Sequence, residues 1–447
     1  MKKEPILVYN LFPLLYGEIK NWHAPMESAH SMGFNTIFLN PVFQSGFSGS
    51  LYSIKDHLKI DQRFLKGRGP KQNTDPLKKF IQAAHKKGLK VLVDLVINHT
   101  AIDSPLLKKH PSWFLFEGKE PVHPGAFDGD NWVEWGDLAQ VDNRDSGDKK
   151  GLYEYWGKVI DFYQELGFDG FRADAAYQIP VELWSFLIAR ARKKNPGSVF
   201  LAETLGCEID DVLEITRCGF DYTFNSVKYW DYREPWSLEQ LHQQLIYLKD
   251  VSTVGFPESH DTARLYAEAG EDLNRVKAKL LNVFFWSEGM MIPSGFESCA
   301  RKRLSVVETA PQDQEPVNQD LSDYLKKLLE LKRQYRIFSE DSYIESVIPD
   351  DGNNVLALLK ISRSREERAL FLLNTDFSSY ERIFFKDLAR AFKMKGTPID
   401  LSLEYPMDLI PAEFEYHLRP GQVKLLYMTG KAGILRRFSE LKTKTAE

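Results

Sequence analysis

Arg172 and Asp174 are separated by one residue at the end of a mainly apolar stretch, GFDGFRADAAY, which spans residues 167–177. Side chains two residues apart on a β-strand point to the same face. We therefore expect both side chains to project together from the carboxyl end of a buried strand. A neighbouring arginine lowers the pKa of a carboxyl group and keeps it ionised, which suits a nucleophile. The alternative interpretation is a structural ion pair.

Polar side chains also end three other apolar runs. VDLVINHT carries Asp94, Asn98 and His99, FLAET carries Glu203, and GFPESHDT carries Glu258, His260 and Asp261. In a parallel barrel these ends meet at one rim. Crowded carboxylates push their pKa values apart, so that one group keeps its proton while another is ionised. Glycoside hydrolysis needs one ionised and one protonated carboxyl group, because the carboxylate attacks the anomeric carbon and the carboxylic acid protonates the leaving oxygen.

The elements that must position these residues alternate along most of the chain. Short apolar runs occupy residues 6–12, 36–42, 91–97, 168–173, 199–203, 222–225, 253–257 and 290–293. Helical patterns occupy residues 22–32, 74–88, 151–166, 181–194, 208–217, 238–248, 274–286 and 321–335. Eight strands alternating with eight helices predict an α/β fold, a (β/α)8 TIM barrel. An open doubly wound sheet is the alternative, because periodicity alone does not fix closure.

The pattern also predicts the domain organisation. The catalytic barrel is assigned to residues 1–99 and 150–337. Residues 100–149 form a short insert after the third strand, which is rich in Trp and Phe and too long for an ordinary βα loop, and we expect it to overhang the active site. From residue 338 to residue 447 the pattern changes to alternating strands, at 355–361, 368–373 and 422–427 among others. This predicts a C-terminal antiparallel all-β domain with a polar tail.

Composition narrows the function classes. The 447 residues carry a net charge of -5, with 43% hydrophobic and 27% charged residues, as in ordinary globular proteins. No basic excess suggests nucleic-acid binding. The three cysteines lack the spacing of a disulfide framework or zinc site, which indicates a reducing compartment. No apolar stretch is long enough for a membrane span, and polar residues and prolines interrupt any signal-peptide core. We therefore predict a cytoplasmic protein without nucleic-acid or membrane partners.

In this order, VDLVINHT, GFDGFRADAA, FLAET and FPESHDT resemble the four signature regions of the α-amylase superfamily, glycoside hydrolase family thirteen. As a set these motifs are highly specific. The all-β tail is similar to the C-terminal domain of that family. The resemblance implies that Asp174 is the nucleophile of a covalent glycosyl-enzyme intermediate and that Glu203 is the general acid/base. It implies that Asp261 is a third carboxylate, which binds sugar hydroxyls and stabilises the transition state.

The resemblance also implies a set of substrate-binding residues. These are Arg172, His99 and His260 at the cleavage subsite, Asp94 in the first signature region, and Tyr52 as the tyrosine that stacks on the sugar. Tyr177 is a further candidate for substrate binding, because its loop can contact the acceptor. Plainer interpretations stay open: Asp94 could support the site through hydrogen bonds, Tyr52 could simply pack, and Glu258 could orient His260 or lie on the surface. Many α-amylases carry Lys-His where this chain has Tyr177 and Gln178, which argues against an ordinary endo-amylase.

No cofactor is predicted to be required, and calcium binding stays open. Asn98 matches a calcium ligand of the family, but an amide that orders a loop explains it equally well. The insert has no obvious cluster of calcium-binding carboxylates, although Asp128, Asp130, Asp137 and Asp142 are available.

Together these observations predict a retaining glycoside hydrolase that cleaves α-glucosidic bonds, α-1,4 bonds in particular, in maltooligosaccharides or glycogen-type glucans. An α-glucan or maltosyl transferase or a phosphorylase is the second interpretation, because it would share the covalent intermediate and differ only in the acceptor. A non-catalytic carbohydrate-binding homologue is a third, which the presence of all three carboxylates disfavours.

Overall fold

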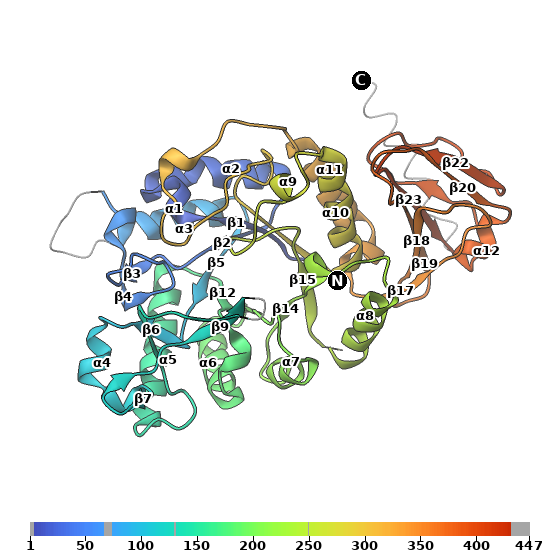
Figure 1. Cartoon of the computed structure of the whole chain (residues 1–447). Coiled ribbons are helices and arrows are strands. Elements are labelled where there is room, and N and C mark those ends of the chain that lie inside the picture. Colours follow the sequence, from blue (N-terminus) through green and yellow to red (C-terminus); the bar gives the residue numbers. More distant parts are fainter. Residues whose placement is uncertain (1–3, 67–73, 129–130, 249, 431–447) are drawn as a thin grey trace.

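Eight parallel strands form a closed barrel in the computed structural model, which describes residues 4–66, 74–128, 131–248 and 250–430 (Figure 1). The strands are β1 (Leu7–Leu11), β2 (Thr36–Leu39), β5 (Lys90–Leu95), β12 (Gly170–Ala173), β13 (Val199–Ala202), β14 (Tyr222–Phe224), β15 (Ser252–Gly255) and β16 (Gly289–Pro293). All eight predicted strands are confirmed. β1 pairs with β2 on one side and with β16 on the other, which closes the sheet and excludes the open doubly wound alternative.

The predicted helices surround this barrel. They are α2 (His23–Met32), α3 (Asp75–Lys86), α5 (Lys149–Leu166), α6 (Val181–Lys194), α7 (Ile209–Thr216), α8 (Pro235–Tyr247), α10 (Leu273–Trp286) and α11 (Ser322–Gln334). α2 and α5 end at Gly33 and Gly167, which adopt φ of 99° and 110°. Glycine is favoured there because it has no Cβ to oppose the left-handed conformation. The single-turn helices α1 (Pro13–Tyr16), α4 (Pro105–Lys109) and α9 (Leu265–Glu268) were not predicted, because one turn shows no periodicity.

The barrel strands are apolar on both faces because both faces are buried. Phe38, Leu92 and Leu201 belong to one buried cluster with residues of β14 to β16, whereas Ile37 and Val91 pack into the larger cluster that includes the helices. Such two-sided burial is typical of parallel sheets. Gly170 allows β12 and β13 to approach closely, since a Cβ there would clash with the backbone carbonyl of the paired strand. The close packing of these two strands supports Arg172 and Asp174, the polar residues that follow Gly170.

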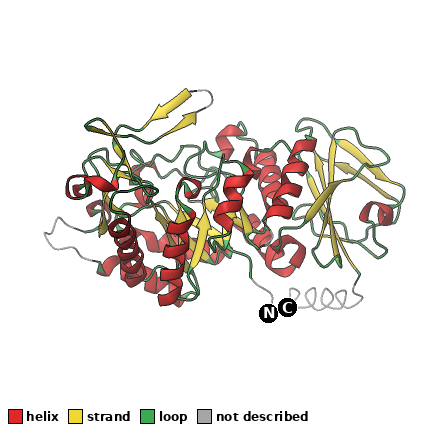
Figure 2. Cartoon of the chain, turned by 90° about the horizontal axis from the view of Figure 1, so that it is seen from below, coloured by secondary structure: helices red, strands yellow, loops and turns green. Residues whose placement is uncertain are grey.

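The segment between β5 and α5 contains an antiparallel pair and two small hairpins. β6 (His99–Ala101) pairs with β11 (Leu138–Gln140), β7 (Phe116–Glu117) with β8 (Glu120–Pro121), and β9 (Gly125–Asp128) with β10 (Asn131–Glu134). The β9–β10 hairpin stands out from the body of the molecule at the top of Figure 2. Trp113 and Phe114 are buried here, whereas Trp132 and Trp135 are exposed. A further hairpin, β3 (Phe43–Ser45) with β4 (Ile54–Ile60), follows β2.

A mainly antiparallel domain follows α11 and packs beside the barrel (Figure 1). One sheet has the order β17 (Tyr343–Ser346), β18 (Val355–Ile361), β19 (Glu367–Asn374), β23 (Val423–Thr429) and β21 (Ile399–Asp400), and β20 (Glu381–Phe385) pairs with β22 (Phe414–Leu418). Leu358, Phe371 and Tyr427 on one face of the larger sheet join the barrel's cluster, so the two domains share a core. The predicted strands are confirmed, with the short helix α12 (Leu388–Phe392) as an unpredicted addition.

The predicted polar tail lies outside the described residues from residue 431 onward. No helix in the described ranges is both long and apolar enough to cross a membrane.

Candidate active site

One guanidinium group connects three carboxyl groups at the carboxyl end of the barrel. Arg172 lies on β12, in register with Asp94 on β5. Its Nη1 donates to both carboxylate oxygens of Asp94 at 2.8 Å and to Oδ1 of Asp174 at 3.0 Å. Its Nη2 lies 3.3 Å from Oε2 of Glu203, just after β13. Arg172 and Asp174 therefore share a face, and adjacent strands bring their polar ends together because they are parallel.

A tight turn after β12 fixes Glu203 relative to Asp174. The backbone N–H of Ala175 donates to Oε2 of Glu203 at 2.7 Å. Ala175 adopts φ of 42°, in the left-handed region that non-glycine residues rarely occupy. The indole N–H of Trp184, on α6, donates to the carbonyl of Ala176 at 3.0 Å and holds the turn from below.

Burial is the largest influence on the pKa values of the two central carboxyl groups, Glu203 and Asp174. It raises the pKa of Glu203 to about 7, and the negative charge of Asp174 adds to the rise while Arg172 opposes it. Burial also raises the pKa of Asp174, against the opposing effect of Arg172. The expectation that Arg172 would hold the Asp174 pKa below its ordinary value is therefore wrong in net direction, because loss of hydration outweighs the ion pair. Glu203 is therefore placed for proton-linked chemistry near neutral pH.

Tyr52 forms a second set of contacts with Asp94 and His260. The Tyr52 hydroxyl donates to Oδ2 of Asp94 at 2.6 Å, accepts from Asn40 at 3.0 Å and lies 2.7 Å from Nε2 of His260. The Tyr52 and His260 rings stack, with centroids 5.6 Å apart and planes inclined by 6°. Asn40, which follows β2, was not predicted, because an asparagine after a strand is common in loops. These contacts fit the supporting role that the sequence analysis considered for Asp94.

The two predicted histidines are buried and keep nitrogen atoms without a well-formed hydrogen bond to the described residues. This applies to both ring nitrogens of His99 and to Nδ1 of His260. Burial lowers the pKa of each histidine to about 4, so both are neutral at neutral pH. A neutral imidazole can both donate and accept a hydrogen bond, which suits a sugar hydroxyl.

Asp261 stands at the edge of the cluster. Its side chain is 59% exposed, and Oδ2 lies 3.1 Å from Nε2 of His260. Its negative charge contributes to the raised pKa of Asp174, so the two carboxylates are near one another. Glu258 does not belong to the cluster and does not orient His260. It is buried, and it accepts hydrogen bonds from Arg264 at 2.7 Å and from the Leu265 backbone at 2.5 Å. Both interpretations offered for Glu258 are thus wrong.

Asn98 is engaged by protein side chains. Its amide donates to Oε1 of Gln178 at 2.5 Å, and its Oδ1 accepts from Gln140 at 2.8 Å. Nε2 of Gln178 also lies 3.5 Å from the hydroxyl of Tyr177. The network of Asn98 therefore includes both residues that replace the Lys-His pair of many α-amylases. Gln140, on β11 of the insert, was not predicted, because no local pattern distinguishes it. The amide oxygen that would bind calcium is therefore already an acceptor.

The carboxylates of the insert were the other candidates for binding calcium. Within the ranges that the structure describes, no group of three His, Cys, Asp or Glu side chains could hold a metal. The Asp142 carboxylate accepts from the Asp145 backbone at 2.7 Å. Asp130 and the side chain of Asp128 lie outside the described part. The arrangement around Asn98 thus fits a loop-ordering amide and does not fit a calcium ligand.

A cavity of about 560 Å³ lies beside the loop that follows Glu203 in the sequence. Its wall begins with the residues that follow Glu203, from Thr204 to Cys207, and continues along the loop after β14 and along α8. Tyr229, Trp230 and Trp236 supply aromatic surface, and Tyr229 and Trp236 are partly exposed. Sequence reasoning missed this cavity, although three aromatic residues within eight positions after a predicted strand were a usable signal.

Comparisons with known proteins agree with the fold and the motifs. The family described as "Glycogen debranching enzyme, glucanotransferase domain" matches residues 1–121. An α-1,4-glucan:maltose-1-phosphate maltosyltransferase of Burkholderia pseudomallei is 22% identical over 85% of this chain and 34% of its own length. An intracellular maltogenic amylase of Bacillus subtilis is 20% identical over 83% of this chain and 64% of its own length. The chain thus spans about a third to two thirds of these relatives.

Among solved structures, an α-amylase from Lactobacillus plantarum superimposes with a TM-score of 0.76 and 20% identity, covering 95% of this chain and 98% of that chain. The barrel with its appended antiparallel domain is therefore an α-amylase-type fold. The chain is thus similar in sequence to α-amylase-type enzymes over most of its length and has their fold.

Proposed function

We propose that this protein is a retaining enzyme that cleaves α-1,4-glucosidic bonds in maltooligosaccharides or glycogen-type glucans. The observation that carries the proposal is the sharing of one guanidinium by Asp174 and Glu203. Retaining glycosidases need their two carboxyl groups about 5–5.5 Å apart, whereas inverting enzymes need a wider gap for water. A shared guanidinium favours the shorter spacing. The names of the two relatives, a maltosyltransferase and a maltogenic amylase, support an α-glucan substrate.

In this mechanism Asp174 attacks the anomeric carbon while Glu203 donates its proton to the leaving oxygen. A covalent glycosyl-Asp174 intermediate forms, and the C–O bond to the leaving sugar breaks. Glu203, now ionised, then removes a proton from the incoming acceptor, which displaces Asp174 and restores the starting state. Arg172 offsets the negative charge around the attacking carboxylate.

The test is a product analysis with purified protein and maltoheptaose, with and without inorganic phosphate, alongside Asp174→Asn. We expect shorter products that retain the α configuration, and their loss in the Asp174→Asn variant. Products of inverted configuration would contradict the retaining mechanism. Absence of turnover on maltoheptaose and glycogen would instead favour a carbohydrate-binding protein without catalysis.

Glucan transfer is the second candidate function, favoured by the cavity beyond Glu203. An acceptor sugar needs a binding surface near the acid/base, and the cavity is lined by the residues that follow Glu203, with Trp236 and Tyr229 in its wall. The match to a glucanotransferase domain supports this candidate. Products longer than maltoheptaose, or a sugar phosphate formed only with phosphate, would identify transfer. Trp236→Ala should then lower the ratio of transfer to hydrolysis about 2- to 10-fold through loss of stacking.

We also propose that the enzyme acts in the cytoplasm and requires no metal. The unpaired Cys207, Cys218 and Cys299 support a reducing compartment, and one relative is described as intracellular. The engaged amide of Asn98 supports independence from calcium.

A further inference from the structure

Asp261 is carried by a loop that joins β15 to the short helix α9 and spans residues 256–264. Its side chain is 59% exposed, and within the described part of the chain its short polar contact is to His260 at 3.1 Å. The His260 ring is held separately, because it stacks on the rings of Tyr52 and Phe12. The position of the Asp261 carboxylate therefore depends on how firmly the backbone of the loop is held.

A buried ion pair closes the base of this loop. Nη1 of Arg264 donates to Oε1 of Glu258 at 2.7 Å, and both side chains are 2% exposed. The backbone N–H of Leu265 donates to the second carboxylate oxygen of Glu258 at 2.5 Å. Because Glu258 precedes Asp261 and Arg264 follows it, the pair joins the two ends of the segment that carries this carboxylate.

Arg264 also connects the loop to the segment that follows β16. Its Nη2 donates to the carbonyl of Ser294 at 2.8 Å, and its Nε donates to the carbonyl of Lys302 at 3.1 Å. From the same segment, Nη2 of Arg303 donates to the backbone carbonyl of Asp261 at 2.6 Å. The segment after β16 thus holds the loop both at its base and at Asp261 itself.

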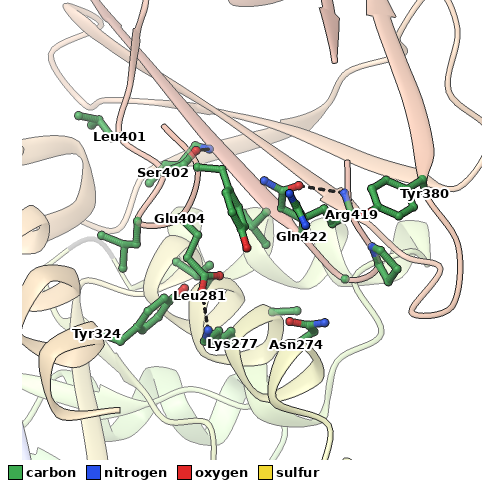
Figure 3. A pocket seen from close by; sticks show the side chains of 17 residues that line it. Asn274, Lys277, Leu281, Tyr324, Tyr380, Leu401, Ser402, Glu404, Arg419 and Gln422 are labelled. Carbon is green, nitrogen blue, oxygen red and sulfur yellow. Dashed lines mark hydrogen bonds and ion pairs between the residues drawn. The ribbon is translucent and has the colours of Figure 1, made fainter. Parts of the chain in front are cut away.

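Stability alone does not explain why this ion pair is buried. Two charges lose their hydration on burial, so an apolar pair of similar size is often equally stable or more stable. By contrast, Lys277 pairs with Glu404 at 2.5 Å in the wall of a cavity between α10 and the C-terminal domain, and Glu404 is 41% exposed (Figure 3). A fully buried pair fixes geometry through directional hydrogen bonds, which apolar side chains cannot provide.

We propose that Glu258, Arg264 and Arg303 are positioning residues that hold the Asp261 carboxylate in place through the backbone of its loop. This inference rests on the proposed function and on the role that the family resemblance implies for Asp261. Small displacements of a group that acts on the transition state cost large factors in rate. Since Asp261 would act on the sugar that is transferred, loss of the pair should slow substrates with good and poor leaving groups equally.

The test replaces the ion pair by apolar residues in the full chain. Glu258→Leu combined with Arg264→Met should melt close to the native chain, because the two buried charges are removed together. The same double variant should lower kcat on maltoheptaose about 10- to 100-fold, because Asp261 is displaced. Its kcat on α-maltosyl fluoride should fall by the same factor. The alkaline limb of its pH–rate profile should stay at about 7, since Glu203 keeps its contacts.

A second buried ion pair provides the matched control. Lys424 and Asp400 pair at 2.6 Å in the C-terminal domain, and neither side chain is exposed. Asp400→Leu combined with Lys424→Met should leave kcat unchanged. Arg303 is exposed, so Arg303→Gln should fold normally and lower kcat about 2- to 10-fold through loss of its bond to Asp261. This variant tests the proposal even where the double variant of Glu258 and Arg264 does not fold.

Native kcat in the double variant of Glu258 and Arg264, or in Arg303→Gln, would overturn the proposal. An equal loss of kcat in the control pair, or a loss confined to maltoheptaose, would overturn it as well, because the effect would then be general or would act on the leaving group. Absence of turnover by the native chain would overturn the proposed function and this inference with it. Native turnover with unaffected variants would overturn this inference alone.

Discussion

The backbone N–H of Ala175 donates a 2.7 Å hydrogen bond to the Glu203 carboxylate, so the turn after one barrel strand positions a carboxyl group carried by the next. Asp174 immediately precedes this turn. The two carboxyl groups that we assign to nucleophilic attack and proton transfer are therefore held by one short segment as well as by Arg172. Such positioning matters because small displacements of reacting groups cost large factors in rate.

Substitutions of Ala175 test this relationship. Ala175→Val should lower kcat about 10- to 100-fold, because a β-branched residue is strongly disfavoured at φ of 42° and the turn must shift away from Glu203. Ala175→Gly tolerates this φ and should retain most activity. Loss of the N–H bond should also raise the Glu203 pKa further and move the alkaline limb of the pH–rate profile of Ala175→Val upward. Equal kinetics of the two variants would show that the turn does not position Glu203.

Substrates with different leaving groups separate the roles of Asp174 and Glu203. Glu203→Gln should lower turnover of maltoheptaose about 10²–10⁴-fold, because the leaving oxygen is no longer protonated. The same variant should retain much more activity on α-maltosyl fluoride, since fluoride leaves without a proton. Asp174→Asn should be inactive on both substrates. If Glu203→Gln loses both activities equally, Glu203 is not the proton donor.

The raised carboxyl pKa values predict a bell-shaped pH dependence of kcat/KM. Glu203 must be protonated to act as an acid, so activity should fall as pH rises through about 7. Asp174 must be ionised to attack, so activity should also fall in acid, at a pH above the ordinary aspartate value of 3.8. The alkaline limb should be absent when Glu203→Gln is assayed on α-maltosyl fluoride.

Burial of Glu203 should also affect stability. The folded state binds this proton more tightly than the unfolded chain, so its contribution to stability is present below the unfolded pKa of about 4.5 and is lost as pH rises to about 7. Thermal melting of Glu203→Gln between pH 5 and pH 8 should therefore show a smaller decline than the native chain.

Metal removal provides an independent test of the site around Asn98. Dialysis against a chelator should leave the melting temperature and activity unchanged, because Asn98 already bonds to Gln140 and Gln178. Added calcium should be equally without effect, since only a ligand that binds the folded state raises its stability. A calcium-dependent increase in melting temperature that Asn98→Ala abolishes would show that the amide network rearranges to bind the ion.

The sequence by itself determined the eight barrel strands, the antiparallel strands that follow them and which polar residues stand at the strand ends. Each of these depends on local patterns: apolar runs, helical periodicity and polar residues directly after a strand. Asp174 and Glu203 could be proposed as catalytic residues because a charged residue after a buried run is unusual, and because four such motifs resemble the family's signature regions in order.

Only the tertiary structure decided the relationships that join distant residues. Closure depends on pairing between β1 and β16, which lie at opposite ends of the barrel sequence. The direction of the Asp174 pKa shift was mispredicted, because the adjacent Arg172 is visible in the sequence whereas the depth of burial is not. The cavity near Glu203 likewise arises from packing between separate segments, and only the aromatic residues in its wall leave a local signal in the sequence.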